Sequence, residues 1–174
     1  MLEVIKKRRA CRKFLSKEVE QEKIDEIIKA GLFAPSGMNA QTPVIIQISD
    51  KKTRDELAKL NLKLLNRSTP DGFDSFYNAP VILLVASNKN GLSVHDGAAT
   101  IENMLLEATN QGLASCWIHR AKEELESEEG RKILSFTGLN FDDYIGIGHV
   151  IIGYPDESFI YPPKIVKEGR VFKK

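Results

Sequence analysis

The segment Pro80–Val85 (PVILLV) decides the fold, because an unbroken apolar run of this length indicates a strand buried on both faces. Segments with helix or strand patterns lie on either side of it. Further strands are predicted at 44–48, 113–118 and 144–154, and helices at 19–33, 51–65, 94–111 and 123–136, after a short helical segment before Arg8. This order predicts one layered α/β or α+β domain with helices packed on a central sheet.

Alternation of strands and helices would by itself favour a doubly wound parallel sheet. That architecture usually carries a glycine-rich phosphate loop at a strand-to-helix turn. The candidate glycine cluster, Gly146-Ile147-Gly148, lies instead inside the last predicted strand. The sequence therefore argues against a dinucleotide site of the Rossmann type.

Local signals indicate where several elements end. The 19–33 helix should stop before Pro35, since proline disfavours helical backbone in the residue before it. Ser93–Asp96 has the spacing of a capping box at a helix start, and Gly112 suits the left-handed position after that helix. Because this helix is apolar nearly all round, we expect it to be central or to lie in an interface.

The C-terminal part is more polar. We expect 123–136 to form one polar surface helix. The tail from Pro155 contains three prolines and is expected to be extended and to wrap over another surface.

Composition narrows the functional classes. The chain has 174 residues, 42% of them hydrophobic and 28% charged, and its 25 basic and 24 acidic residues give a net charge of +1. Such a balance gives no reason to expect nucleic acid or an anionic membrane as a partner. Cys11 and Cys116 lack the dense spacing of a secreted disulfide scaffold, and the charged N-terminus does not fit a signal peptide, so a cytoplasmic protein is expected. The histidines at 95, 119 and 149 lack metal-ligand spacing, so no metal site is expected, and His149 should pack within its strand.

Three polar segments carry candidate chemistry. The first, Arg8–Phe14 (RRACRKF), could hold an anion through its arginines, but it could equally be a solvated helix end or, more weakly, a nucleic-acid patch. The second, 34–43 (APSGMNAQTP), offers amide and hydroxyl groups to a polar heterocycle, although these residues also build ordinary turns. The third, Gly112–His119 (GLASCWIH), holds the single tryptophan, which by itself is consistent with packing alone.

Together and in this order, the three segments resemble the nitroreductase superfamily of FMN enzymes, and Ala79-Pro80 and Gly153-Tyr154-Pro155 extend the likeness. The resemblance implies an α+β fold with a central mixed or antiparallel sheet flanked by helices. It also implies an intertwined homodimer with each FMN in the interface. Residues 1–174 would form a single domain, and the tail, about 155–174, would extend over the partner subunit.

The resemblance also implies roles for individual residues. Arg8 would reach the FMN phosphate, Arg12 would lie at the N1 and C2 carbonyl side of the ring, and Arg9 and Ala10 match further opening contacts. Ala10 stands where many members have serine, which leaves only a backbone contact. Pro35, Ser36, Gly37 and Asn39 match the loop that reaches the flavin from the partner subunit. Ile118 and His119 match the segment whose backbone meets N5 and O4. Arg170, with Lys167 or Lys164, matches the basic phosphate contact of the tail.

The implied activity is transfer of a hydride from NAD(P)H through FMN to a small acceptor such as a nitro compound or a quinone. The cofactor supplies the redox chemistry, so no side-chain nucleophile is required. Arg12 near N1 would stabilise the anionic reduced flavin. Dehalogenation, flavin fragmentation and oxidase chemistry are alternatives on the same fold, and nucleic-acid binding through Lys6–Lys13 is the non-enzyme alternative.

Overall fold

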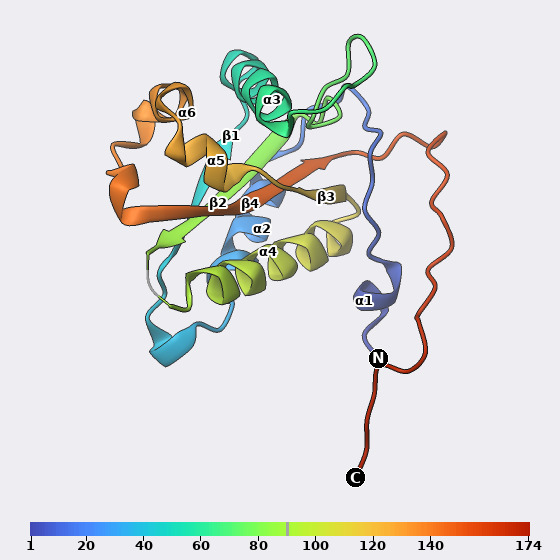
Figure 1. Ribbon diagram of the computed structural model, residues 1–174. Coiled ribbons are helices and arrows are strands. Elements are labelled where there is room, and N and C mark those ends of the chain that lie inside the picture. The colour runs from blue at the N-terminus through green and yellow to red at the C-terminus, as the bar shows by residue number, and fades with distance from the viewer. Residues whose placement is uncertain (90) are drawn as a thin grey trace.

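The structure, a computed structural model, describes residues 1–89 and 91–174. Its centre is one four-stranded sheet in the order β1-β2-β4-β3, in which all three neighbouring pairs are antiparallel (Figure 1). The strands are β1 (Pro43–Ile48), β2 (Val81–Asn88), β3 (Ala114–Ile118) and β4 (Tyr144–Gly153). The α+β class with an antiparallel sheet is confirmed, and the parallel sheet suggested by alternation alone is wrong.

Helices cover both faces of this sheet, as Figure 1 shows. They are α1 (Glu3–Lys7), α2 (Gln21–Leu32), α3 (Lys51–Leu65), α4 (Ser93–Asn110), α5 (Ala121–Glu126) and α6 (Glu128–Ile133), with 3₁₀ turns η1 (Gly37–Asn39), η2 (Ser135–Thr137) and η3 (Phe141–Asp143). No helix within the described ranges has the length and apolarity that crossing a bilayer requires.

The predicted central strand has two buried faces. Ile82 and Leu84 of β2 belong to a core cluster shared with α3 and α5, whereas Leu83 and Val85 belong to a second cluster shared with α2 and α4. Alternate residues of a strand point to opposite faces, so an apolar residue is required at every position. All four side chains are fully buried, which confirms the prediction.

Two predicted helix boundaries are wrong. Ser93 is the first residue of α4 rather than its N-cap, which is Leu92, and its hydroxyl donates to the carbonyl of Asn88 at the end of β2. The expected single helix at 123–136 is broken at Ser127, where the backbone is extended and the side chain accepts from the Gly130 amide at 3.0 Å. Ser127 thus N-caps α6, because its hydroxyl satisfies an amide that the helix cannot pair internally.

Other boundaries agree with the sequence. α2 ends at Leu32, ahead of Pro35, and Gly112 after α4 has the left-handed backbone that favours glycine (φ +74°). The Glu123–Phe136 region is less polar than expected, because Glu124 and Leu125 are fully buried.

The C-terminal tail runs beside the N-terminal segment of its own chain (Figure 1). Phe14 forms a bridge with Pro155, the Arg9 guanidinium donates to the Pro162 carbonyl at 2.6 Å, and Lys164 Nζ donates to the Ile5 carbonyl at 3.0 Å. The two ends of the chain are therefore held together over the free side of β3.

Candidate functional site

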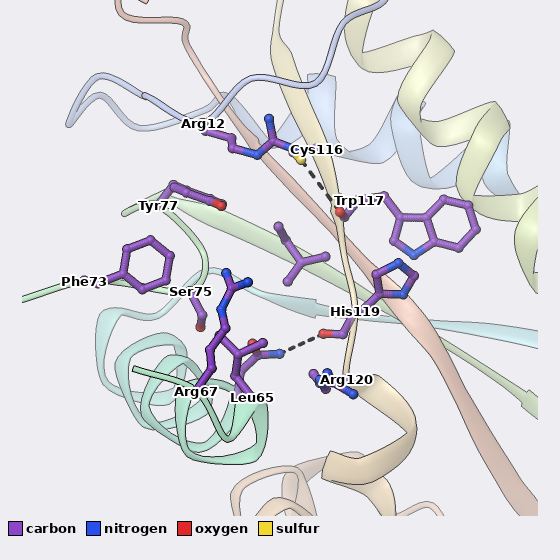
Figure 2. A pocket seen from close by; sticks show the side chains of 12 residues that line it. Arg12, Leu65, Arg67, Phe73, Ser75, Tyr77, Cys116, Trp117, His119 and Arg120 are labelled. Carbon is purple, nitrogen blue, oxygen red and sulfur yellow. Dashed lines mark hydrogen bonds between the residues drawn. The ribbon is translucent and has the colours of Figure 1, made fainter. Parts of the chain in front are cut away.

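A cavity of about 240 Å³ lies beside the C-terminal end of β3 (Figure 2). Arg12 enters it from the N-terminal segment, and Arg67 enters from the segment after α3. The lining comprises Arg12, Asn61, Leu65, Arg67, Phe73, Ser75, Tyr77, Cys116, Trp117, Ile118, His119 and Arg120. The site therefore joins three parts of the chain that are far apart in sequence.

The lining is cationic and aromatic. It contains three arginines, a histidine and three aromatic rings, and no carboxylate is among its residues. Arginine binds anions with several directed N–H donors and also stacks on flat rings. Arg120 pairs with Glu123 at 2.8 Å through one guanidinium nitrogen, whereas its buried Nε has no hydrogen-bond partner in the part of the chain that the structure describes. This set of groups suits a planar, acceptor-rich anion.

The free edge of β3 explains how Arg12 reaches the cavity. β3 pairs with β4 on one side only, and on the other side Ala10 bridges to Ser115 and the Cys11 amide donates to the Ser115 carbonyl at 3.0 Å. Arg12 follows directly and lies at the cavity. Ala10 is held through its backbone bridge to Ser115, so its position does not depend on a side-chain hydroxyl.

Cys116 lines the cavity but is not a nucleophile. Burial raises the pKa of its thiol, and the nearby positive charges of Arg12 and Arg8 offset this effect only in part. A thiol with a raised pKa stays protonated and unreactive at neutral pH.

The tail also approaches this region. Tyr161 contacts Cys11, and burial together with its hydrogen bond to Cys11 raises the pKa of the Tyr161 hydroxyl to about 12. The phenol is therefore neutral at physiological pH, so it adds no negative charge beside the arginines.

Only part of the predicted site is assembled by one chain. Arg12, Ile118 and His119 lie together at the cavity. Arg8 lies outside its lining and pairs with Glu102 of α4 at 3.7 Å, and Arg9 is bound to the tail carbonyl of Pro162. The remaining basic candidates, Lys167 and Arg170, are exposed in the tail.

The loop predicted to contact a ligand lies next to the start of α4. The Gly37 amide donates to Asp96 Oδ1 at 3.0 Å, and a Cβ on Gly37 would lie 2.0 Å from a Leu92 methyl carbon. Pro35 and Ser36 line a separate, smaller cavity of about 180 Å³. These residues therefore do not reach the β3 cavity of their own chain.

The same loop has an unusual backbone. Met38, Asn39 and Gln41 all have left-handed φ angles of 50–54°, although none is glycine. The Gln41 amide donates to Ser36 Oγ at 2.9 Å, which helps to hold this shape. Strained conformations that the surroundings maintain are common where a loop binds a ligand or partner. Met38, at its tip, is 94% exposed.

Several lining residues were not predicted from the sequence. Asn61, Arg67, Tyr77 and Arg120 come from the α3 helix, the segment after it, and the turn before α5. No sequence motif marks these residues. They reach the cavity only because α3 and the segment after it pack beside the end of β3. Among described residues, no group of three or more His, Cys, Asp or Glu side chains could hold a metal ion.

Comparison with known proteins gives a consistent picture. The model of the nitroreductase family matches residues 5–154. A Bacillus subtilis strain 168 protein named FMN reductase (NAD(P)H) is 30% identical over 189 residues, with 97% of this chain and 72% of the relative covered. A solved nitroreductase with bound FMN from Bacteroides fragilis NCTC 9343 is 28% identical, has a TM-score of 0.91, and covers 99% of this chain and 97% of its own. An FMN-dependent nitroreductase from Clostridium difficile R20291 is 30% identical with a TM-score of 0.74, and the match covers 94% and 92% of the two chains.

Proposed function

The chain belongs to the nitroreductase family of FMN-dependent NAD(P)H oxidoreductases, and on that premise we propose that it works as a homodimer that reduces nitro compounds, quinones or similar small acceptors. The observation that carries the proposal is the carboxylate-free cavity at the end of β3, which is lined by Arg12, His119 and Arg120, whose buried Nε has no hydrogen-bond partner.

The residues of this cavity fit FMN. The flavin ring is flat and presents carbonyl oxygens and ring nitrogens as acceptors along one edge, and the cavity offers aromatic walls and donors. When bound, FMN supplies the hydride chemistry. Arg12 would hold a positive charge at the N1 and C2 side of the ring, and the Ile118–His119 backbone would meet the N5 and O4 side. Phe73 and Tyr77 would exclude water from the ring.

The phosphate would be bound outside this cavity, by the paired chain ends. Arg8 and Arg9 lie at the end of α1, and contacts of Pro162 and Lys164 with the N-terminal segment hold the tail beside them. Lys167 and Arg170 follow within a few residues. Several basic side chains around a dianion give strong charge-assisted hydrogen bonds. The tail would move slightly from its present contacts to allow this.

Completion of the site would need a second subunit. No residue of the Pro35–Asn39 loop lines the β3 cavity of its own chain. Pro35, Met38 and Asn39 of this loop are exposed, and Met38 and Asn39 have left-handed backbones. Phe33 beside it is 78% exposed, and Phe172 in the tail is 92% exposed. We propose that the loop and the tail both contact the partner, and that the loop closes the partner's cavity.

The dimer can be tested by sedimentation. Because Phe33, Met38 and Phe172 would otherwise expose large apolar side chains to water, we expect the chain to sediment as a dimer, at twice 19.5 kDa, down to nanomolar concentration. Met38→Glu, in the loop, should raise both the dimer dissociation constant and the FMN dissociation constant. Val166→Glu tests the proposed contact of the tail with the partner separately. A monomer that binds FMN as tightly as the dimer would refute the shared site.

The function is tested by loading the purified protein with FMN and measuring turnover. We expect one FMN per chain, reduction of the bound flavin by NADH or NADPH in stopped flow, and reoxidation by nitroaromatic and quinone acceptors. Tight FMN binding without reduction by either nucleotide would favour the other flavin reactions of this fold. A folded protein that takes up no FMN and is retained on DNA in a salt-dependent way would refute the proposal in favour of nucleic-acid binding.

A further inference from the structure

Behind the cavity lies a fully buried pair of ionisable side chains. Glu124 of α5 and His149 of β4 are both 0% exposed, and His149 Nε2 lies 2.8 Å from Glu124 Oε2. Burial of such a pair removes two polar groups from water, and an apolar pair of similar size would often be at least as stable. Fold stability alone therefore does not explain why these residues are here.

The pair is connected to the cavity wall by hydrogen bonds. Asn61 Nδ2 donates both to Glu124 Oε1 at 2.6 Å and to the carbonyl oxygen of His119 at 2.8 Å, and the second bond is one of the dashed lines in Figure 2. His149 Nδ1 lies 3.3 Å from the carbonyl oxygen of Ile118. A carbonyl oxygen only accepts, so Nδ1 carries the proton in this contact. Glu124 thus orients two donors that bind consecutive backbone carbonyls.

These bonds act where the sheet stops. Ile118 and His149 are the last pair of the β3–β4 ladder, and Arg120 has a left-handed backbone with φ +85°. Beyond Ile118 the strand pairing no longer determines the backbone direction. There the side chains of Asn61 and His149 hold the backbone by hydrogen bonds. The imidazole of His149 is held in turn by the Phe76 ring, whose centroid lies 5.0 Å away with the two rings at 62°.

Peptide planarity converts these bonds into a direction. In a trans peptide the N–H points opposite to the C=O of the same unit. The Ile118 carbonyl faces His149 on β4, so the His119 amide faces away from β4, toward the sheet edge where Arg12 lies. A rotated carbonyl would turn this amide out of the cavity.

We propose that Glu124 is a positioning residue that, through Asn61 and His149, aims the Ile118–Arg120 backbone at the flavin. The inference rests on the proposed function, since it assigns the buried network to that same site. Glu124 touches neither cofactor nor substrate and acts only through its two partners.

A matched set of Glu124 variants tests this in the FMN-loaded protein. Glu124→Leu removes both acceptor oxygens while filling the space, so the FMN dissociation constant should rise about tenfold, as for losses of supporting contacts behind a bound metal. The midpoint potential and the visible absorption band of the remaining bound flavin should shift as well. Glu124→Gln can still accept from Asn61 and can donate to His149 Nε2. Its FMN dissociation constant should therefore lie within about twofold of the parent's, and its midpoint potential and absorption band should match the parent's.

Arg54→Met is the control for a general loss of stability. Arg54 is also buried on α3 and donates to the Ala79 carbonyl at 3.1 Å, but it does not line the cavity. The Arg54→Met variant should have a lower melting temperature but the same flavin potential and spectrum as the parent. A folded Glu124→Leu protein with the parent's FMN affinity, potential and spectrum would overturn the inference, whereas a parent that binds no FMN would overturn the proposed function.

A measurement on the unmodified chain serves if Glu124→Leu does not fold. Nitrogen-15 spectra of the imidazole should show a proton on His149 Nδ1, and FMN addition should shift this resonance together with the His119 amide. If FMN shifts the His119 amide and leaves the His149 side chain unchanged, the network does not position the backbone and the inference fails.

Discussion

Gly146→Ala is expected to give the largest loss of stability of any substitution considered for this chain. An ideal Cβ at this position would lie 2.2 Å from the carbonyl carbon and oxygen of Ala121 and 2.6 Å from the Lys122 nitrogen. These are backbone atoms of α5, which cannot move aside as a flexible side chain can. We expect a loss of about 4 kcal/mol or more in unfolding free energy, within the range reserved for severe steric conflict.

The measurement is thermal or chemical denaturation beside a matched glycine. Gly91→Ala is the control, because a Cβ there meets no atom within 4 Å and its φ is not left-handed. It should change stability by no more than about 0.5 kcal/mol. A Gly146→Ala protein that melts within a degree of the Gly91→Ala protein would show that α5 does not pack as described.

This result would also explain the glycine cluster in the last strand. The β2–β4 register shifts between Val85 and Ala86, so that Gly148 and Gly146 face consecutive residues of β2 and Ile147 is the extra residue of a bulge. A Cβ on Gly148 would lie 2.1 Å from Trp117 Nε1. The two glycines thus admit α5 on one face of the sheet and the indole ring of Trp117 on the other.

The sequence predicted the parts of the fold that depend on local pattern. The apolar run of β2, the end of α2 before Pro35 and the glycine after α4 each have a cause within a few residues. Strand direction has no such local cause, and alternation pointed to a parallel sheet. The break at Ser127 was missed because helical periodicity continues across it, while tertiary packing decides where the chain turns.

The residues of the site likewise fall into those that local sequence patterns predict and those that only tertiary packing brings to the site. Arg12, Ile118 and His119 were predicted because they lie in segments with recognisable motifs, and one chain brings them together. Asn61 and Glu124 were missed, since each looks like an ordinary polar residue of an amphipathic helix. His149 was correctly expected to pack within its strand, but its bond to Glu124 depends on the placement of α5 over β4.

Arg12→Ala is expected to make the bound FMN harder to reduce. Arg12 is the cavity arginine from the N-terminal segment, and we place its charge beside the N1 and C2 edge, where negative charge develops on reduction. Loss of a hydrogen bond to a charged group costs about 1.5–3 kcal/mol. For a two-electron couple this lowers the midpoint potential by about 30–60 mV, because 30 mV corresponds to about 1.4 kcal/mol. Potentiometric titration with reference dyes measures the shift.

Arg8→Ala is the matched comparison, because it removes the same charge from the same segment at a different place. Arg8 lies outside the cavity lining, pairs with Glu102 at 3.7 Å, and is assigned to the phosphate. The phosphate keeps its charge on reduction, so this variant should weaken FMN binding about tenfold while the bound flavin keeps its potential to within about 10 mV. Equal potential shifts in the two variants would mean that Arg12 acts only through long-range charge. An unchanged potential in Arg12→Ala would remove it from the ring edge and leave Arg67 or Arg120 as the cation that tunes the flavin.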